Sequence, residues 1–249
     1  HGRALAYAAR AVGSHATICM SHLVPENKVS EIRRLGATVR MIGYSQDDAQ
    51  EEVERLVAEE GLCMIPPFDH FDIVAGQGTI GLEILESAPE IATVLVPLSG
   101  GGLAAGVAAA VKGLRPQAKV IGISMDRGAA MKASLDAGHP VQAKEYRSLA
   151  DSLGGGIGLA NAWTYPMCEA LLDEVVLVTE REIANGIRHA YGNEREVVEG
   201  AGAVGIAALL SRKIADLSGG PIAIIMSGRN IDMDLHRQVI SELNVYEAD

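Results

Sequence analysis

The chain of 249 residues contains few cysteines and few aromatic side chains. Its three cysteines, Cys19, Cys63 and Cys168, are odd in number and lie in or beside apolar segments. No Cys-x-x-Cys or Cys/His spacing of the kind that binds zinc occurs in the sequence. We therefore expect buried, reduced thiols in a cytoplasmic protein, rather than disulfides, a metal centre or a catalytic thiol.

The chain also lacks an excess of positive charge and a long apolar run. The formal net charge is −11, and the lysines and arginines are scattered. This balance argues against nucleic acid or an anionic membrane surface as a partner. No apolar run approaches the length of a membrane span, and no secretory signal is visible. Hydrophobic residues make up 48% of the chain, which is enough for the core of one large domain or two small ones.

Helical and strand patterns alternate along the first part of the chain. Alanine-rich or amphipathic segments predict helices, and short apolar segments between them predict strands. The helices are expected over residues 3–12, 26–35 and 46–60, and the strands over residues 16–20, 38–42 and 62–65. This order predicts a small parallel sheet with flanking helices.

A boundary between two lobes is expected over residues 66–72, where two prolines, two aromatic residues and three polar turn residues occur together. Asp69 and Asp72 are expected to cap the helix that follows this boundary, and Thr179 to cap the helix that begins at residue 180. Further strands are expected over residues 91–98, 119–124, 174–178 and 221–226, with helices over residues 73–85, 103–114, 128–137, 162–172, 180–191, 202–212 and 232–243. We predict an α/β protein with two parallel-sheet lobes, a small one over residues 1–70 and a large one over residues 71–249.

A glycine-rich turn lies between the buried strand over residues 91–98 and the helix over residues 103–114. Free backbone N–H groups and the positive end of the helix dipole make such a turn an anion site. A tight turn without any ligand explains the same residues equally well. The glycine spacing is neither G-x-G-x-x-G nor a Walker loop, so a dinucleotide or a nucleoside triphosphate is not favoured.

Ligands of open parallel sheets bind at the carboxyl ends of the strands. This rule places the glycine turn, the end of the strand over residues 221–226 and the irregular loop over residues 150–158 around one cleft. Because glycine lets a phosphate approach the backbone, we expect a side chain at Gly101 to occupy the place of the anion.

Several motifs in combination resemble the serine/threonine dehydratases, which are pyridoxal-phosphate enzymes of fold type II. The motifs lie at Val24-Pro25, at Lys28, and over residues 32–39, 73–83, 96–103, 149–153, 199–205 and 227–232. The resemblance extends from His1 to about Leu243. The Ser-Gly-Arg-Asn form at residues 227–230 is similar to that of the hydroxyectoine-utilisation dehydratases.

The resemblance implies a set of cofactor-binding residues. They are the backbone amides of Ser99, Gly100, Gly101, Gly102 and Leu103 for the phosphate, Ser227 for the pyridine nitrogen, Glu199 beside the ring, and Ser152 beneath it, where relatives usually have glycine. Without the resemblance, Ser227 is a turn residue at the end of a strand and Glu199 a favourable charge at a helix N-terminus. Ser124 stands where several relatives have an acidic metal ligand, so we expect no metal site there.

The start of the chain also resembles part of a family motif. His1-Gly2 matches the last two residues of Ser-x-Gly-Asn-His-Gly, and the lysine that forms a Schiff base with the cofactor lies upstream of that motif in the family. None of the lysines of this chain stands in the family's Ser-x-Lys context; they are Lys28, Lys112, Lys119, Lys132, Lys144 and Lys213. We therefore expect an N-terminally truncated chain with no catalytic residue of its own and no activity.

The function implied by the resemblance is that of an ammonia-lyase in amino-acid metabolism. Such an enzyme eliminates water from threonine or serine and releases a 2-oxo acid and ammonia. We also expect a homodimer, as in the family. Three alternatives remain open: a racemase, a β-replacement enzyme similar to cysteine synthase, and a non-catalytic relative that only binds a phosphate-bearing ligand.

Overall fold

The computed structural model describes residues 1–44, 46–217 and 219–241, and the chain divides into two compact units, His1–Pro67 and Phe68–Asp249. The division lies inside the segment 66–72, where the sequence places the boundary. Ser45, Ser218 and residues 242–249 lie outside the described residues, and so does the end of the helix expected to reach Leu243. No described helix is long and apolar enough to cross a membrane.

The first unit is built around a parallel pair of strands, β1 (Thr17–Met20) and β2 (Thr38–Met41), with Thr17 opposite Thr38. Three helices accompany the pair, α1 (Gly2–Ala11), α2 (Glu26–Arg34) and α3 (Gln46–Glu60). The core of this unit consists of small and branched apolar side chains; its buried members are Ala6, Ala16, Ile18, Ile32 and Leu35. The three predicted helices and the first two predicted strands are confirmed.

The strand expected over residues 62–65 does not form. Residues 61–66 have no regular structure, and the side chains of Leu62 and Ile65 are 41% and 43% exposed. A strand forms only where a neighbouring strand takes up its backbone hydrogen bonds, and among the described residues of this unit only β1 and β2 are paired. The expectation of three buried cysteines is also corrected: Cys63 is exposed and Cys19 is half-buried, while Cys168 is buried as expected.

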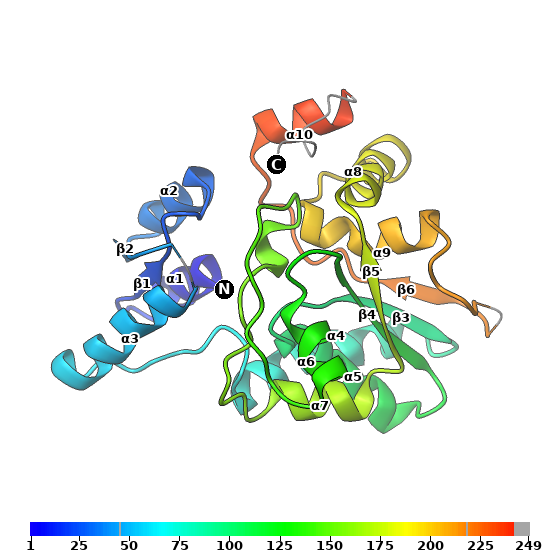
Figure 1. The fold of residues 1–249 in the computed structure, drawn as a ribbon, viewed down its shortest axis with the longest axis horizontal. Coiled ribbons are helices and arrows are strands. Elements are labelled where there is room, and N and C mark those ends of the chain that lie inside the picture. Colours follow the sequence, from blue (N-terminus) through cyan, green and yellow to red (C-terminus); the bar gives the residue numbers. More distant parts are fainter. Residues whose placement is uncertain (45, 218, 242–249) are drawn as a thin grey trace. The chain divides into compact units, whose positions relative to one another are not determined.

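The second unit contains a four-stranded sheet with the order β5-β4-β3-β6 (Figure 1). All three pairings are parallel. The strands are β3 (Thr93–Pro97), β4 (Lys119–Met125), β5 (Glu174–Val178) and β6 (Ile222–Ile224). The helices are α4 (Phe71–Ser87), α5 (Gly102–Leu114), α6 (Ala130–Ala137), α7 (Thr164–Leu171), α8 (Glu180–His189), α9 (Gly200–Leu210) and α10 (Met233–Ile240). Every residue of β3 is buried, as in sheets covered on both faces.

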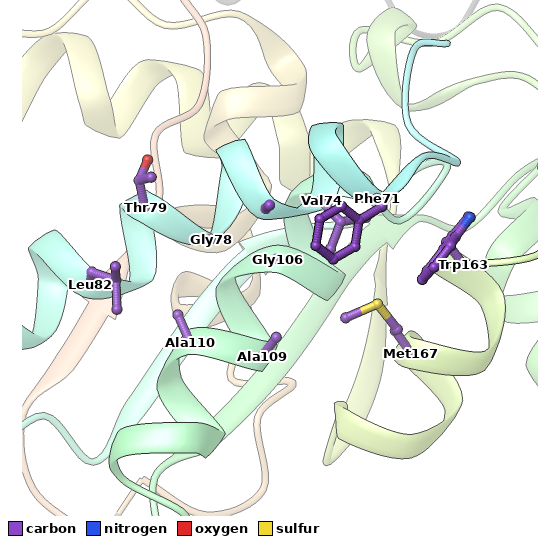
Figure 2. Close-up of a pocket in the computed structure, with 11 residues that line it drawn as sticks. Phe71, Val74, Gly78, Thr79, Leu82, Gly106, Ala109, Ala110, Trp163 and Met167 are labelled. Carbon is purple, nitrogen blue, oxygen red and sulfur yellow. The ribbon is translucent and has the colours of Figure 1, made fainter.

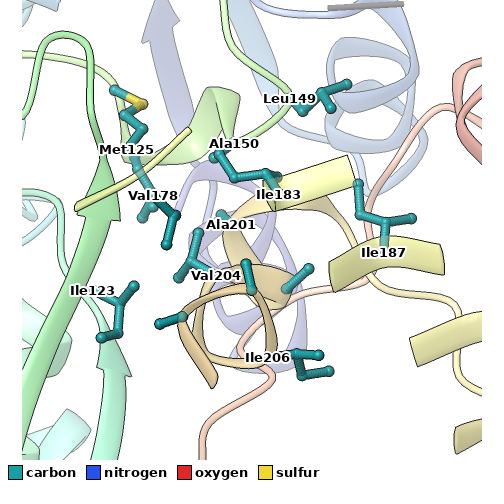
Figure 3. Close-up of a cluster of buried hydrophobic side chains, with 14 of the residues drawn as sticks. Ile123, Met125, Leu149, Ala150, Val178, Ile183, Ile187, Ala201, Val204 and Ile206 are labelled. Carbon is teal, nitrogen blue, oxygen red and sulfur yellow. The ribbon is translucent and has the colours of Figure 1, made fainter. Parts of the chain in front are cut away.

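Helices cover both faces of this sheet because successive strand residues point to opposite sides. Leu95 and Ile123 belong to the core that includes α8 and α9, part of which Figure 3 shows. Val94 and Val96 belong to the second core, with α4, α5 and α7 on the other face. The sheet is therefore the rigid middle layer, and its carboxyl edge carries the loops that the sequence singles out.

Helix α8 begins where the sequence predicts its cap. The Thr179 hydroxyl accepts a hydrogen bond from the Glu182 amide at 3.3 Å, and the Glu182 carboxylate accepts one from the Thr179 amide at 2.7 Å. This reciprocal capping box satisfies two amides that no helical carbonyl can reach.

Helix α10 packs on α8 and carries a buried histidine, which contacts the π-helical turn Ala190–Glu194 that follows α8. His236 is 2% exposed, its ring meets the Tyr191 ring edge-on at 5.3 Å, and its Nε2 atom has no hydrogen-bond partner in the described part of the chain. Arg188 of α8 donates from Nε to the Val239 carbonyl at 2.7 Å. Burial lowers the pKa of His236, because the apolar surroundings disfavour the charged ring.

The packing of His236 predicts a pH-dependent stability. Because the folded-state pKa lies below the unfolded value, the unfolded chain binds more protons as the pH falls through about 6.5. The stability that the neutral, buried His236 ring contributes is therefore fully present above that pH and decreases below it. We expect the thermal midpoint to fall more steeply between about pH 7.5 and about pH 5.5 in the natural chain than in His236→Leu. The control is His139→Leu at an exposed histidine, and equal slopes for all three proteins would contradict the prediction.

Candidate functional site

The glycine turn connects the end of β3 to the start of α5. Gly101 is the N-cap of α5 and has a φ of +92°, in the left-handed region that glycine adopts without strain. No side chain caps the helix. The predicted strand, turn and helix are therefore confirmed.

The amides of this turn are open donors. Within the described residues, the N–H groups of residues 99–103 form no hydrogen bond to a backbone carbonyl. The first amides of any helix lack an intrahelical partner, and the dipole of α5 adds partial positive charge at this end. Residues 99–103 therefore present several donors to an anion without any positively charged side chain.

The reason for a glycine at position 101 differs from the one expected. A Cβ atom there would lie 2.7 Å from Met131 Cε, 2.9 Å from Thr164 Cβ and 3.1 Å from Cys168 Sγ. A side chain would therefore point into the core and not into the place of an anion. Positive φ and close packing against α7 require this glycine, and the expectation that a side chain would fill the anion position is wrong.

Asp69 holds the start of α7 and not the start of α4. Its carboxylate accepts hydrogen bonds from the amides of Ala162 at 2.8 Å, Trp163 at 2.8 Å and Thr164 at 2.9 Å. Helix α4 is capped instead by the His70 ring, which accepts from the Asp72 amide at 3.2 Å. The expected capping of α4 by Asp69 is therefore wrong, because its carboxylate accepts hydrogen bonds from three amides at the start of α7.

Thr164 and Cys168 of α7 support the glycine turn from behind. The Thr164 hydroxyl donates to the Gly100 carbonyl at 2.7 Å, and Cys168 Sγ lies 3.9 Å from the Gly101 carbonyl. Burial raises the pKa of the Cys168 thiol to about 12, so it stays protonated and is no nucleophile. Sequence spacing could not identify this pair, since more than 60 residues separate it from the turn.

A second group of predicted residues meets at the start of α9. The Ser152 hydroxyl donates to Glu199 Oε1 at 3.1 Å, and the Glu199 amide donates to the Gly228 carbonyl at 3.1 Å. Glu199 is 9% exposed and is the N-cap of α9. The 3-10 turn at Asp151–Leu153, the start of α9 and the segment after β6 are thus brought together.

Ser227 follows β6 and is exposed. Because β6 pairs with β3 in parallel, Ser227 and the glycine turn both follow the carboxyl ends of adjacent strands. The structure thus places the predicted residues at one edge of the sheet. In the residues it describes, no hydrogen bond joins the turn to Ser152 or Ser227.

An apolar groove of about 370 Å³ lies elsewhere on this unit, between α4, α5 and the start of α7 (Figure 2). Its wall is almost free of polar groups, with Phe71, Leu82, Trp163 and Met167 among its members. Ligand sites for polar molecules need convergent donors and acceptors, so the groove does not suit a phosphate-bearing molecule. In the described chain, no three His, Cys, Asp or Glu side chains gather as a metal ion requires.

Comparison with known proteins identifies the family. Residues 1–228 match the family described as pyridoxal-phosphate dependent enzyme. The chain therefore belongs to the pyridoxal-phosphate-dependent enzymes. The expected α/β architecture with parallel sheets, that of fold type II, is confirmed.

The chain is also similar to individual members of this family. The chain is 76% identical over 241 residues to a protein of Sinorhizobium fredii (strain NGR234) provisionally named threonine dehydratase, covering 97% of this chain and 72% of that protein. It is 38% identical over 242 residues to the L-threonine ammonia-lyase of Thermotoga maritima, covering 97% of this chain but only 59% of that enzyme. The solved structure of maize serine racemase superimposes with a TM-score of 0.88 at 30% identity, covering 97% of this chain and 74% of the racemase.

The packing of Gly101 predicts a strong effect of a single methyl group. We expect Gly101→Ala to lower the free energy of unfolding by about 2 kcal/mol, because the left-handed backbone and the contacts with α7 both oppose a Cβ atom. Gly113→Ala in the same helix is the matched control, since its Cβ atom would meet nothing within 4 Å. It should be neutral or stabilise by up to about 1 kcal/mol. Urea unfolding measures both, and equal effects would contradict the account.

Proposed function

We propose that the chain is the cofactor-binding part of an ammonia-lyase that removes water from threonine or serine. The observation that carries the proposal is the open set of amides at residues 99–103, on the edge of the sheet that also holds Ser152, Glu199 and Ser227. The name of the 76% identical relative supports the substrate class. A donor set without a cation suits a phosphate that is bound by amides and a helix dipole.

Each group would have a separate task when pyridoxal phosphate is bound. The cofactor supplies an acceptor for the electrons released at the α-carbon of an amino acid. The amides of the glycine turn would hold its phosphate, and the Ser227 hydroxyl would bond the pyridine nitrogen. A hydroxyl cannot keep that nitrogen protonated as a carboxylate would. This neutral partner would favour prompt elimination of water, in which the substrate loses its α-proton and its β-hydroxyl group. The free enamine that results takes up one water molecule and yields the 2-oxo acid and ammonia.

None of the lysines of this chain is proposed to bond covalently to the cofactor. Four of them form ion pairs, which join Lys112 to Asp173, Lys119 to Asp216, Lys132 to Asp136 and Lys213 to Glu182. Lys144 lies over the Tyr146 ring, 5.1 Å from its centre. Transfer of the substrate amine to the cofactor normally starts from a lysine that is bonded covalently to the cofactor. We therefore propose that the 249-residue chain alone has no useful turnover.

Racemisation of serine is the second candidate, favoured by the match to maize serine racemase. The two reactions differ in their products, since elimination releases a 2-oxo acid and racemisation only the D-amino acid. The narrower role in hydroxyectoine utilisation is supported only by the Ser-Gly-Arg-Asn form around Arg229. A homodimer and a cytoplasmic location complete the proposal; the exposed apolar side chains around the groove and the free thiols support them.

Stable conjugates test this function on the chain as it exists. Reduction joins pyridoxal phosphate to an amino acid through a secondary amine, so the product binds without a protein lysine. We expect the threonine and serine conjugates to bind at least about tenfold tighter than the lysine conjugate, because a site for a small hydroxy amino acid would reject the long side chain. Equal binding of all conjugates would favour a non-catalytic phosphate-binding protein. Stoichiometric labelling of one lysine by pyridoxal phosphate and borohydride would contradict the proposal about lysines.

A further inference from the structure

We propose that Thr164 is a positioning residue, whose hydroxyl sets the direction in which the glycine turn presents its amides to a phosphate. The proposal rests on the proposed function, since it assigns a task to a side chain behind the same phosphate site. Thr164 is fully buried, at 0% exposed, and its hydroxyl faces the glycine turn.

Among the residues that the structure describes, the proton of the Thr164 hydroxyl has one acceptor, the Gly100 carbonyl. The orientation of the Asn161 side-chain amide follows from the Tyr165 backbone N–H, which can only donate and which donates to Asn161 Oδ1 at 2.7 Å. The NH₂ group of Asn161 therefore faces Thr164 and donates to its hydroxyl oxygen at 2.8 Å. Because that bond uses the oxygen as an acceptor, the hydroxyl proton goes to the Gly100 carbonyl at 2.7 Å.

The orientation of the Gly100 carbonyl decides where the next amide points. In a planar trans peptide, the C=O of one residue and the N–H of the next point in opposite directions. The bond from Thr164 holds the Gly100 carbonyl toward α7, so the Gly101 N–H points away from α7. The Gly101 carbonyl accepts from the Ala105 amide at 2.7 Å and lies 3.9 Å from Cys168 Sγ. By the same rule, the Gly102 N–H points opposite to the Gly101 carbonyl. Successive backbone N–H groups that point to one place form an anion-binding nest.

The turn needs this external support because it has no side chains of its own. A peptide between two glycines rotates more freely than any other, so its orientation comes from its neighbours. The carboxylate of Asp69 holds the amides of residues 162–164, which keeps Thr164 in place. Phe68, the residue before Asp69, packs directly against Gly100. The turn is therefore held between residue 68 on one side and α7 on the other.

Two substitutions test the role of the hydroxyl. Thr164→Val removes it and keeps the shape, whereas Thr164→Ser keeps it. The affinities of the 249-residue chain for pyridoxal phosphate, pyridoxal and inorganic phosphate are measured by calorimetry. We expect the valine variant to lose about tenfold in affinity for the two phosphate-bearing ligands and to bind pyridoxal unchanged, the loss typical of one misdirected charge-assisted hydrogen bond. The serine variant should stay within about twofold of the natural chain for all three.

A merely structural role gives a different pattern. It would lower the thermal midpoint and weaken pyridoxal and pyridoxal phosphate alike, and that equal loss would overturn the proposal. If the valine variant does not fold, Thr164→Cys replaces it, because a thiol has a similar size but is a weak donor. We expect a loss for the phosphate-bearing ligands alone, and an unchanged preference for pyridoxal phosphate over pyridoxal would again overturn the proposal.

The natural chain separates this inference from the proposed function. If it binds pyridoxal phosphate no better than pyridoxal, the phosphate site is absent and both proposals fail. If it prefers pyridoxal phosphate and the valine variant keeps that full preference, the phosphate site stands and only the role of Thr164 is wrong.

Discussion

The hydrogen bond from the buried Thr164 hydroxyl to the Gly100 carbonyl is the interaction on which the arrangement of the candidate site depends. It joins a turn without side chains to a helix that is held by the Asp69 carboxylate. Hydrogen bonds thereby join segments far apart in the sequence, around residues 69, 100 and 164. The site needs such a support, because amides can bind an anion strongly only when their direction is set in advance.

The parallel sheet determines where the glycine turn lies. Strands β3 and β6 are neighbours and run in the same direction, so the loops after both lie at one edge. The two cores on opposite faces bury every residue of β3. The Glu199 amide bonds the Gly228 carbonyl, which ties the segment after β6 to the start of α9. The chemistry proposed for the chain therefore depends on loops whose positions the sheet and its helices determine.

Local features could be predicted from the sequence, and non-local contacts could not. The glycine turn and the Thr179 cap depend on a few adjacent residues, and both were predicted correctly. The prediction of a strand over residues 62–65 is wrong, because a strand depends on a pairing partner that the local sequence does not reveal. Sequence proximity predicts that Asp69 caps the next helix, whereas its carboxylate accepts hydrogen bonds from amides more than 90 residues away. Gly101 was assigned correctly to the turn, but the contacts that require it come from α6 and α7.

The most direct test of the account is an NMR titration of the chain labelled with ¹⁵N-glycine. The central claim is that the amides of the glycine turn bind a phosphate group. We expect the Gly100, Gly101 and Gly102 resonances to shift with both pyridoxal phosphate and inorganic phosphate, since an anion that accepts a hydrogen bond moves the amide signal. Pyridoxal should leave these three resonances in place. Unchanged signals at saturating phosphate, or shifts confined to other glycines, would contradict the claim.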